Sequence, residues 1–137
     1  MGKKFFTPQE ATAMLPYVIM DIRRLQEVKS AFVSRAMQLR EMRLQRESGV
    51  GSVAAEDLFR IEAEMDFLQL ETGTLAESVR LKGAELKDID SGLVDFPGIL
   101  DGEEVLLCWK FGEERIEYYH GVHEGYHGRK PLPARDD

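Results

Sequence analysis

Three histidines, His120, His123 and His127, lie close together near the C-terminal end of the chain. Neutral imidazoles, joined by a nearby glutamate, are typical zinc ligands, and three protein ligands with one open position are typical of a catalytic zinc. However, the intervening glycines favour a loop, in which the three rings need not converge, and the H-x2-H-x3-H spacing matches no established zinc motif. The three side chains are therefore candidate metal ligands, with partly exposed loop histidines as the alternative. The sequence predicts no cofactor.

A second set of polar and aromatic residues comes from the same C-terminal region, and its members are candidates for binding a ligand: Asp95, Trp109, Glu113, His120 and Arg129. A histidine oriented by a carboxylate can act as a general base, and an arginine can hold an anion with two parallel hydrogen bonds. In the alternative interpretation these residues are structural: Arg129 pairs with a carboxylate, Asp95 caps the turn at Pro97, and His120 ends a strand. We favour that alternative and predict no catalytic residue, because no recognisable nucleophile or metal motif accompanies the set.

Cys108 is the single cysteine of the chain, so no intrachain disulfide can form. It lies between Leu107 and Trp109 in an apolar run, where a buried thiol behaves as a small apolar group and not as a reactive thiolate. Trp109 could stack on a ring together with the tyrosines at 118 and 119, but such residues more often form the core of a small sheet.

Composition limits the classes of function. The chain has 137 residues, 43% of them hydrophobic, and a formal net charge of −7. This charge disfavours binding to nucleic acid, which needs clustered positive charge. The sequence shows neither a signal peptide nor an apolar run long enough to span a membrane, and together with the lone cysteine this predicts a cytoplasmic protein.

The first half of the chain has the pattern of two long helices. Thr7, Pro8 and Glu10 form a helix start with a capping box, and Pro16 is expected to end or kink a short helix over residues 8–15. A long helix to about residue 47 should follow, then a linker at 48–52 with a cap at Ser52, and a second helix over about 53–86. Joined by so short a linker, the helices should form an antiparallel hairpin, which we assign to residues 8–88.

Apolar residues at alternating three- and four-residue steps define the contact seam of this hairpin. On the first helix Lys29 occupies one seam position, and its side chain should extend outward. The seam residues are Val18, Ile22, Leu25, Phe32, Ala36 and Leu39 on the first helix, and Leu58, Ile61, Met65, Leu68, Thr72, Leu75 and Val79 on the second.

A second apolar stripe consists of Phe59, Ala63, Phe67 and Leu70 on the second helix, while Val33, Met37 and Leu44 widen the apolar face of the first. One hairpin cannot cover both faces of a helix, so either the C-terminal sheet or a second copy must cover the stripe. We expect a homodimer that forms a four-helix bundle.

Charge is unevenly distributed between the two predicted helices. Residues 16–48 hold seven Lys or Arg and four acidic residues, whereas residues 53–88 hold four Lys or Arg and nine acidic residues. The basic side chains are interpreted as a solvated face that matches a partner: Arg23, Arg24, Lys29, Arg35, Arg40, Arg43 and Arg46.

From residue 85 the period changes to that of strands. Residues 105–111 alternate as a central strand covered on both faces, residues 115–120 return beside it, and residues 93–96 form a third strand that Pro97 ends. Asp101 and Gly102 mark a turn before the central strand. The expected fold is a single α+β domain: a long antiparallel helical hairpin, a small antiparallel three-stranded sheet as a β cap over 89–131, and a loose tail over 132–137.

The motifs GLVDFP (92–97), EVLLCWKFGE (104–113), YYH (118–120) and EGYHGRKPL (124–132) resemble a small bacterial family, domain of unknown function 2203, and FFTPQEATAMLPYV (5–18) is similar to its start. The resemblance spans most of the chain. It implies a bacterial cytoplasmic protein with a helical region and a small sheet, and it brings no established activity, substrate or cofactor. The residues that match the family pattern are Asp95, Trp109, Glu113, His120, Gly125 and Arg129, whereas Tyr119 and His127 depart from it.

Two hypotheses about function follow. In the first, the chain is a noncatalytic protein that self-associates through its helices and can bind a protein partner, but neither nucleic acid nor a membrane. In the second, it is a small enzyme, or a protein that binds a ligand or metal, with its site in the C-terminal block that is rich in glycine, aromatic residues and histidine.

Overall fold

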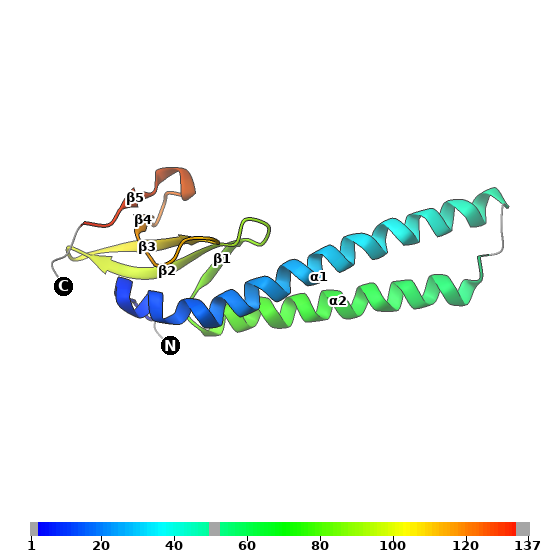
Figure 1. Ribbon diagram of the computed structural model, residues 1–137, viewed down its shortest axis with the longest axis horizontal. Coiled ribbons are helices and arrows are strands. Elements are labelled where there is room, and N and C mark those ends of the chain that lie inside the picture. The colour runs from blue at the N-terminus through cyan, green and yellow to red at the C-terminus, as the bar shows by residue number, and fades with distance from the viewer. Residues whose placement is uncertain (1–2, 50–52, 134–137) are drawn as a thin grey trace. The chain divides into compact units, whose positions relative to one another are not determined.

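The computed structural model describes residues 3–49 and 53–133. Along the chain, the elements are α1 (Pro8–Ser48), α2 (Ala55–Leu81), β1 (Glu85–Asp88), β2 (Leu93–Leu100), β3 (Glu103–Lys110), β4 (Tyr118–Gly121), a 3-10 turn η1 (Tyr126–Gly128) and β5 (Lys130–Pro131), as Figure 1 shows. They divide into two compact units. We call residues 23–75 the hairpin unit, and the described residues of 1–22 and 76–137 the sheet unit.

The start of α1 is fixed by the predicted capping box. The backbone N–H of Glu10 donates to Thr7 Oγ1 at 3.1 Å, and the N–H of Thr7 donates to Glu10 Oε1 at 3.0 Å. The backbone N–H of Thr7, together with the Thr7 side chain, holds the pKa of Glu10 below its usual value. We predicted that a helix over 8–15 ends or kinks at Pro16. It does not end there, because α1 runs through Pro16 to Ser48. Buried apolar side chains before and after Pro16 outweigh one lost backbone hydrogen bond: Ala11, Leu15, Val18 and Ile22.

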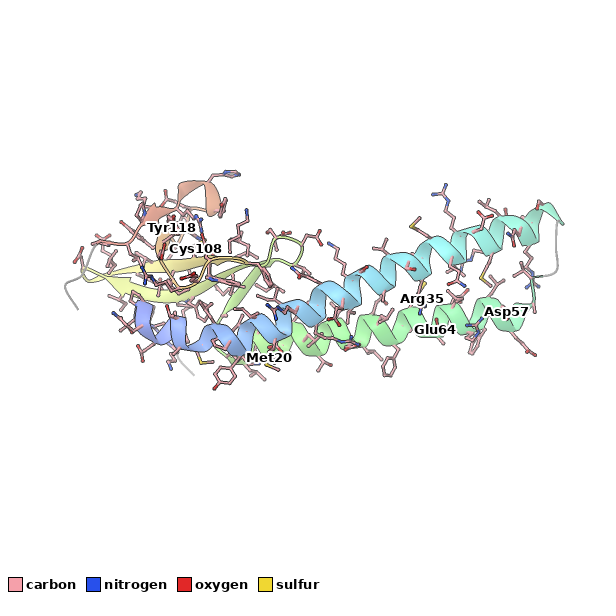
Figure 2. The ribbon with its side chains drawn as sticks, in the orientation of Figure 1. Met20, Arg35, Asp57, Glu64, Cys108 and Tyr118 are labelled. Atoms are coloured by element: carbon pink, nitrogen blue, oxygen red, sulfur yellow. The ribbon has the colours of Figure 1, made fainter. Side chains whose placement is uncertain are left out.

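In the hairpin unit, α1 and α2 are antiparallel and pair along the predicted seam. Leu25, Leu39 and Ile61 are buried in it, as expected. Arg24 binds Glu71 at 2.6 Å, Arg35 binds Glu64 at 2.7 Å and Arg43 binds Glu62 at 3.0 Å, so the partner of each successive arginine lies earlier in α2. Figure 2 shows Arg35 and Glu64 meeting between the helices. These three basic side chains therefore match the acidic helix of their own hairpin.

The limits of the hairpin differ in detail from the prediction. Val28 is buried at the seam position that was assigned to Lys29, whose own side chain is exposed. The second helix begins at Ala55 and ends at Leu81, where Gly83 adopts a positive φ of 89°. Residues 85–88, which we had placed in the hairpin, form strand β1. The predicted linker falls partly on residues 50–52, so its Ser52 cap lies outside the described residues.

The sheet is an antiparallel meander of five strands in the order β1-β2-β3-β4-β5, so the expected α+β class is confirmed and the expected number of three strands is corrected. The two additional strands are the short edge strands β1 and β5. Neither is long enough to show a two-residue hydrophobic period, which explains why the sequence pattern did not indicate them. β3 is the central strand, and Val105 to Trp109 are all buried, as predicted for a strand covered on both faces. The N–H of Leu132 donates to the carbonyl of Glu117 at 2.8 Å, so residue 132 is not loose, contrary to prediction. Residues 134–137 of the predicted tail lie outside the described part of the chain.

Pro97 does not end β2, contrary to prediction. Its carbonyl accepts a hydrogen bond from the N–H of Phe6 at 2.8 Å, on the edge beyond the last residue of β2 that pairs with β1, which is Asp95. In an extended strand the nitrogen and carbonyl of one residue point to the same side, so the missing N–H of Pro97 faces this edge and not β3. No ladder hydrogen bond between β2 and β3 is lost.

The core of the sheet unit lies between one face of the sheet and the N-terminal segment. Phe6 stacks edge-on against Phe96 with ring centroids 5.2 Å apart, and the N–H of Ile116 donates to Thr12 Oγ1 at 3.1 Å. The other residues buried in this unit include Ala11, Leu15, Val18, Ile22, Val79, Val94, Leu107 and Trp109. The opposite face of the sheet carries Asp95, Cys108 and His120.

Candidate functional site

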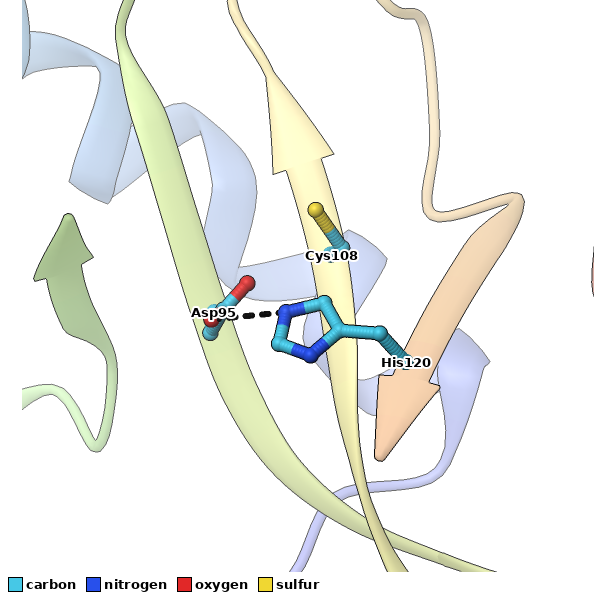
Figure 3. A group of neighbouring side chains, drawn as sticks. All are labelled: Asp95, Cys108 and His120. Carbon is cyan, nitrogen blue, oxygen red and sulfur yellow. Dashed lines mark hydrogen bonds and ion pairs between the residues drawn. The ribbon is translucent and has the colours of Figure 1, made fainter. Parts of the chain in front are cut away.

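Asp95, Cys108 and His120 come from three neighbouring strands and meet on one face of the sheet (Figure 3). Asp95 of β2 lies opposite Cys108 of β3, and His120 of β4 lies opposite Leu106, two residues before Cys108. Adjacent strands are about 4.8 Å apart, so β2 and β4 are separated by about 10 Å and the Asp95 and His120 side chains must reach across β3. The short side chain of Cys108 leaves room for His120 Nε2 to approach Asp95 Oδ2 to 3.0 Å. Asp95 and His120 are each only 2% exposed.

The hydrogen bonds of His120 determine where its protons lie. Its Nδ1 is 2.9 Å from the carbonyl oxygen of Gly121, which can only accept, so Nδ1 carries a hydrogen. A neutral ring would then present the lone pair of Nε2 to Asp95 Oδ2, which also carries lone pairs. One proton must therefore lie between these two atoms, either on an imidazolium beside a carboxylate or on a carboxylic acid beside a neutral imidazole. In both forms the pair has no net charge.

Burial is the main influence on the other two groups. It raises the pKa of Asp95, and the charge and hydrogen bond of His120, with a weaker effect of the neighbouring Cys108 thiol, oppose that rise. Burial and the Asp95 carboxylate together raise the pKa of Cys108 to about 11, although Arg129 acts in the opposite direction. The thiol is therefore protonated at neutral pH and is not an activated nucleophile.

Arg129 and Glu113 form a second polar group beside the first. Arg129 Nη2 binds Glu113 Oε2 at 2.6 Å and Nη1 binds Oε1 at 3.2 Å, and the guanidinium is 3.9 Å from the ring centroid of Tyr118 and 4.5 Å from that of Tyr126. The indole N–H of Trp109 donates to the Glu113 carbonyl at 2.8 Å. The carboxylate and the aromatic rings thus hold the arginine, as in the structural alternative. Nη1 is also 4.0 Å from Cys108 Sγ and so connects the two groups.

Of the residues singled out from the sequence, Asp95 and His120 meet beside Cys108, and Arg129 connects Cys108 to Glu113. Trp109 lies on the other face of β3 and is connected to this group through its hydrogen bond to the Glu113 carbonyl. Asp95 bonds His120 and does not cap the turn at Pro97. His123 and His127 lie elsewhere: both side chains are exposed, the first after β4 and the second in η1. Within residues 3–49 and 53–133, the group of side chains close enough to share a metal ion is Asp95, Cys108 and His120, and not the three histidines.

The importance of Cys108 in this group was missed, although part of the signal was in the sequence. Asp101 and Gly102 have positive φ angles of 52° and 80° and join β2 to β3 as a two-residue turn, as their sequence predicts. A two-residue turn pairs Leu100 with Glu103, and counting back from that pair places Asp95 opposite Cys108. The position of His120 could not be found in this way, because residues 111–117 make a longer connection whose register no turn rule fixes.

Two grooves in the described residues lie apart from the buried polar group. A groove of about 680 Å³ in the sheet unit is lined by Pro8, Thr12, Ile116, Tyr118, Leu132 and others, and it includes neither Asp95 nor His120. A smaller groove of about 340 Å³ in the hairpin unit is lined by Ala36, Leu39, Leu44, Met65 and others. Asp95, Cys108 and His120 therefore line neither of these two grooves.

The hairpin unit presents apolar side chains to its surface. Phe59, Phe67 and Leu70 of the predicted second stripe are 74%, 71% and 71% exposed. Val33, Met37 and Leu44 are exposed on α1. These six residues, which we call the outer stripe, are exposed at helical spacing on the two helices. Leu44 also lines the groove that includes the seam residues Leu39 and Met65.

The chain thus combines a helical hairpin with a five-stranded antiparallel meander. Residues 4–132 match the family of uncharacterised conserved proteins designated DUF2203, and the chain belongs to that family. No curated protein and no solved structure matches it. Within the described residues, neither helix combines the length and the apolar character that crossing a membrane requires.

Proposed function

We propose that this protein is a noncatalytic interaction module that self-associates through its hairpin unit, with the outer stripe as the contact surface and a second copy of the chain as its occupant. The observation that carries the proposal is the exposure of Phe59, Phe67 and Leu70, which leaves most of three large apolar side chains in water. A soluble monomer rarely leaves so many large apolar residues exposed on one element, and such surfaces mark interfaces.

Charge favours a second copy as the occupant. Outside the three ion pairs within the hairpin, residues 23–48 of α1 hold four basic and three acidic residues, whereas residues 55–75 of α2 hold one basic and three acidic residues. Two α2 helices placed together would repel each other, but α1 of one copy and α2 of the other attract. A two-fold pair makes this contact twice, because each copy contributes both helices.

The available area is sufficient for a stable dimer. The six side chains of the outer stripe are 48–74% exposed, so each can bury on the order of 100 Å². Two copies therefore bury about 1,200 Å² if all six side chains are covered, which is the lower end of stable interfaces. A protein partner of the assembled dimer would bind a surface other than this stripe.

The test is the mass of the full chain in solution, measured by light scattering at micromolar concentration. We expect the wild-type chain to be a dimer and the variant Phe59→Ser/Phe67→Ser to be a monomer with unchanged helix content. The matched control is Leu81→Ser, since Leu81 is also on α2 and is 73% exposed but belongs to the sheet unit. This control should remain dimeric. A monomeric wild-type chain, or a double variant that still dimerises, would contradict the proposal.

A further inference from the structure

We infer that Asp95, Cys108 and His120 form a binding site for one thiophilic divalent cation, of which zinc is the best fit. The three residues supply a carboxylate, a thiolate and an imidazole, the ligand types that zinc prefers. Their ligand atoms already lie within 4.8 Å of one another. On a tetrahedral zinc, with bonds of about 2.0–2.3 Å, ligand atoms are roughly 3.3–3.7 Å apart, so small side-chain adjustments suffice.

The hydrogen bond from His120 Nδ1 to the carbonyl of Gly121 directs Nε2 toward the cation. Histidine ligands usually donate their second ring N–H to a carbonyl or carboxylate, which fixes the tautomer and aims the other nitrogen at the metal. Here the donor is Nδ1, at 2.9 Å, and Nε2 faces Asp95. A proton lies between Nε2 and Oδ2 in either form of the pair, and a metal ion can replace that proton.

The surroundings of Asp95 are a second observation in favour of a bound cation. Its Oδ1 is fully buried and has no hydrogen-bond partner among residues 3–49 and 53–133. The whole side chain is 2% exposed. A buried carboxylate oxygen without a partner costs free energy, and a cation bound by both carboxylate oxygens would remove that cost. With Cys108 Sγ and His120 Nε2, the chain then offers three ligand groups, of which the carboxylate can use both of its oxygens.

Charge balance also supports the site. Binding exchanges one divalent cation for two protons: the proton shared by Nε2 and Oδ2 and the thiol proton, both released to solvent. The group has no net charge before the exchange, and it has none afterwards, because one carboxylate and one thiolate balance the cation. The Arg129 guanidinium near Cys108 Sγ is itself neutralised by Glu113, so it does not disturb this balance.

The site can be tested with Co²⁺ as a spectroscopic substitute for zinc, on the full chain without a histidine tag. Metal is added to the folded protein and, separately, during refolding from urea, because the site is buried. We expect one Co²⁺ per chain and a near-ultraviolet band of thiolate-to-metal charge transfer. Cys108→Ala should abolish the band and weaken binding by more than about 100-fold, beyond the loss typical of an outer-shell partner. The matched control His123→Ala/His127→Ala should leave both unchanged.

Thiol protection provides a measurement that needs no variant. At a urea concentration that partly opens the chain, the Cys108 thiol of the zinc-loaded protein should react with a disulfide reagent at least about tenfold more slowly than that of the metal-free protein. The inference is overturned if neither loading route gives stoichiometric metal. It is equally overturned if the band survives in Cys108→Ala, or if binding depends on His123 and His127.

Discussion

Arg129 and Glu113 form a two-pronged ion pair whose members are only 15% and 22% exposed, and the arginine lies between the rings of Tyr118 and Tyr126. The pair ties the residue before β5 to the loop after β3. Glu113 Oε1 also accepts the backbone N–H of Lys110 at 2.8 Å, which fixes the loop itself. The family-matching residues Trp109, Glu113 and Arg129 thus form a clamp on the C-terminal segment.

Replacing Arg129 with lysine should lower the free energy of unfolding by about 1–3 kcal/mol, because lysine can neither form the second parallel hydrogen bond nor stack as a plane between two rings. Urea unfolding followed by tryptophan fluorescence measures the change. The control is Arg115→Lys: Arg115 and Glu117 pair at 2.9 Å but are 70% and 47% exposed, so the effect should be below about 0.5 kcal/mol. Equal losses of unfolding free energy in the two variants would show that the Arg129–Glu113 pair contributes no more to stability than the exposed Arg115–Glu117 pair.

His120→Ala should destabilise the chain by about 3–5 kcal/mol at pH 7, because the variant leaves the Asp95 carboxyl buried without its main partner. Asp95→Ala/His120→Ala should cost clearly less than the sum of the two single variants, since the second change removes the group that the first left unpaired. A double-mutant cycle in urea gives the coupling energy. Additive losses would mean that the two side chains do not interact.

The Cys108 thiol gives a prediction about pH. Its pKa is raised in the folded chain from 9.0 to about 11, so the folded state favours the protonated thiol. The corresponding stability is fully present below pH 9 and is lost as the pH rises toward 11. The difference in unfolding free energy between the wild-type chain and Cys108→Ala should therefore shrink over pH 9–11. A difference that stays constant over this range would contradict the raised pKa.

Gly98 lies where β2 passes close to two neighbours. A Cβ atom there would be 2.9 Å from Leu107 Cγ and 3.0 Å from the carbonyl oxygen of Phe6, so Gly98→Ala should cost about 1–3 kcal/mol. Gly125→Ala is the control, because nothing lies within 4 Å of its added Cβ and its φ of −115° suits alanine. Thermal unfolding of the two variants side by side tests the difference. A control that loses as much stability would imply that glycine is needed for another reason.

The elements that the sequence predicted well are those fixed by local chemistry. The capping box at Thr7, the helical seam and the turn at Asp101 and Gly102 each depend on residues a few positions apart, so the sequence pattern contains the whole signal. The exposure of the outer stripe could also be anticipated, since one hairpin covers one face.

Other features depend on contacts between distant segments, and these could not be predicted. Pro97 is tolerated in β2 only because its edge faces Phe6, and β1 and β5 are too short to show a period. The pairing of Asp95 with His120 requires the register of β4, which depends on a seven-residue connection, and it also requires a short side chain at Cys108 between them. Most residues of the polar group could therefore be identified from the sequence, but the contacts between them could not be predicted.

Pro16 offers a test of the balance that keeps α1 continuous. A proline inside a helix costs roughly 3 kcal/mol relative to alanine, whereas its restriction of the unfolded chain returns up to about 1 kcal/mol. Because Pro16 is exposed, Pro16→Ala restores the backbone N–H without creating a cavity and should raise the free energy of unfolding by about 1–3 kcal/mol. Pro8 is the matched control: it occupies the first position of α1, where no intrahelical hydrogen bond is lost, so Pro8→Ala should change stability by less than about 1 kcal/mol. Denaturation of both variants in urea measures the two effects. If Pro16→Ala does not raise the free energy of unfolding, the carbonyl of Thr12 already has a substitute partner, and Pro16 does not destabilise α1.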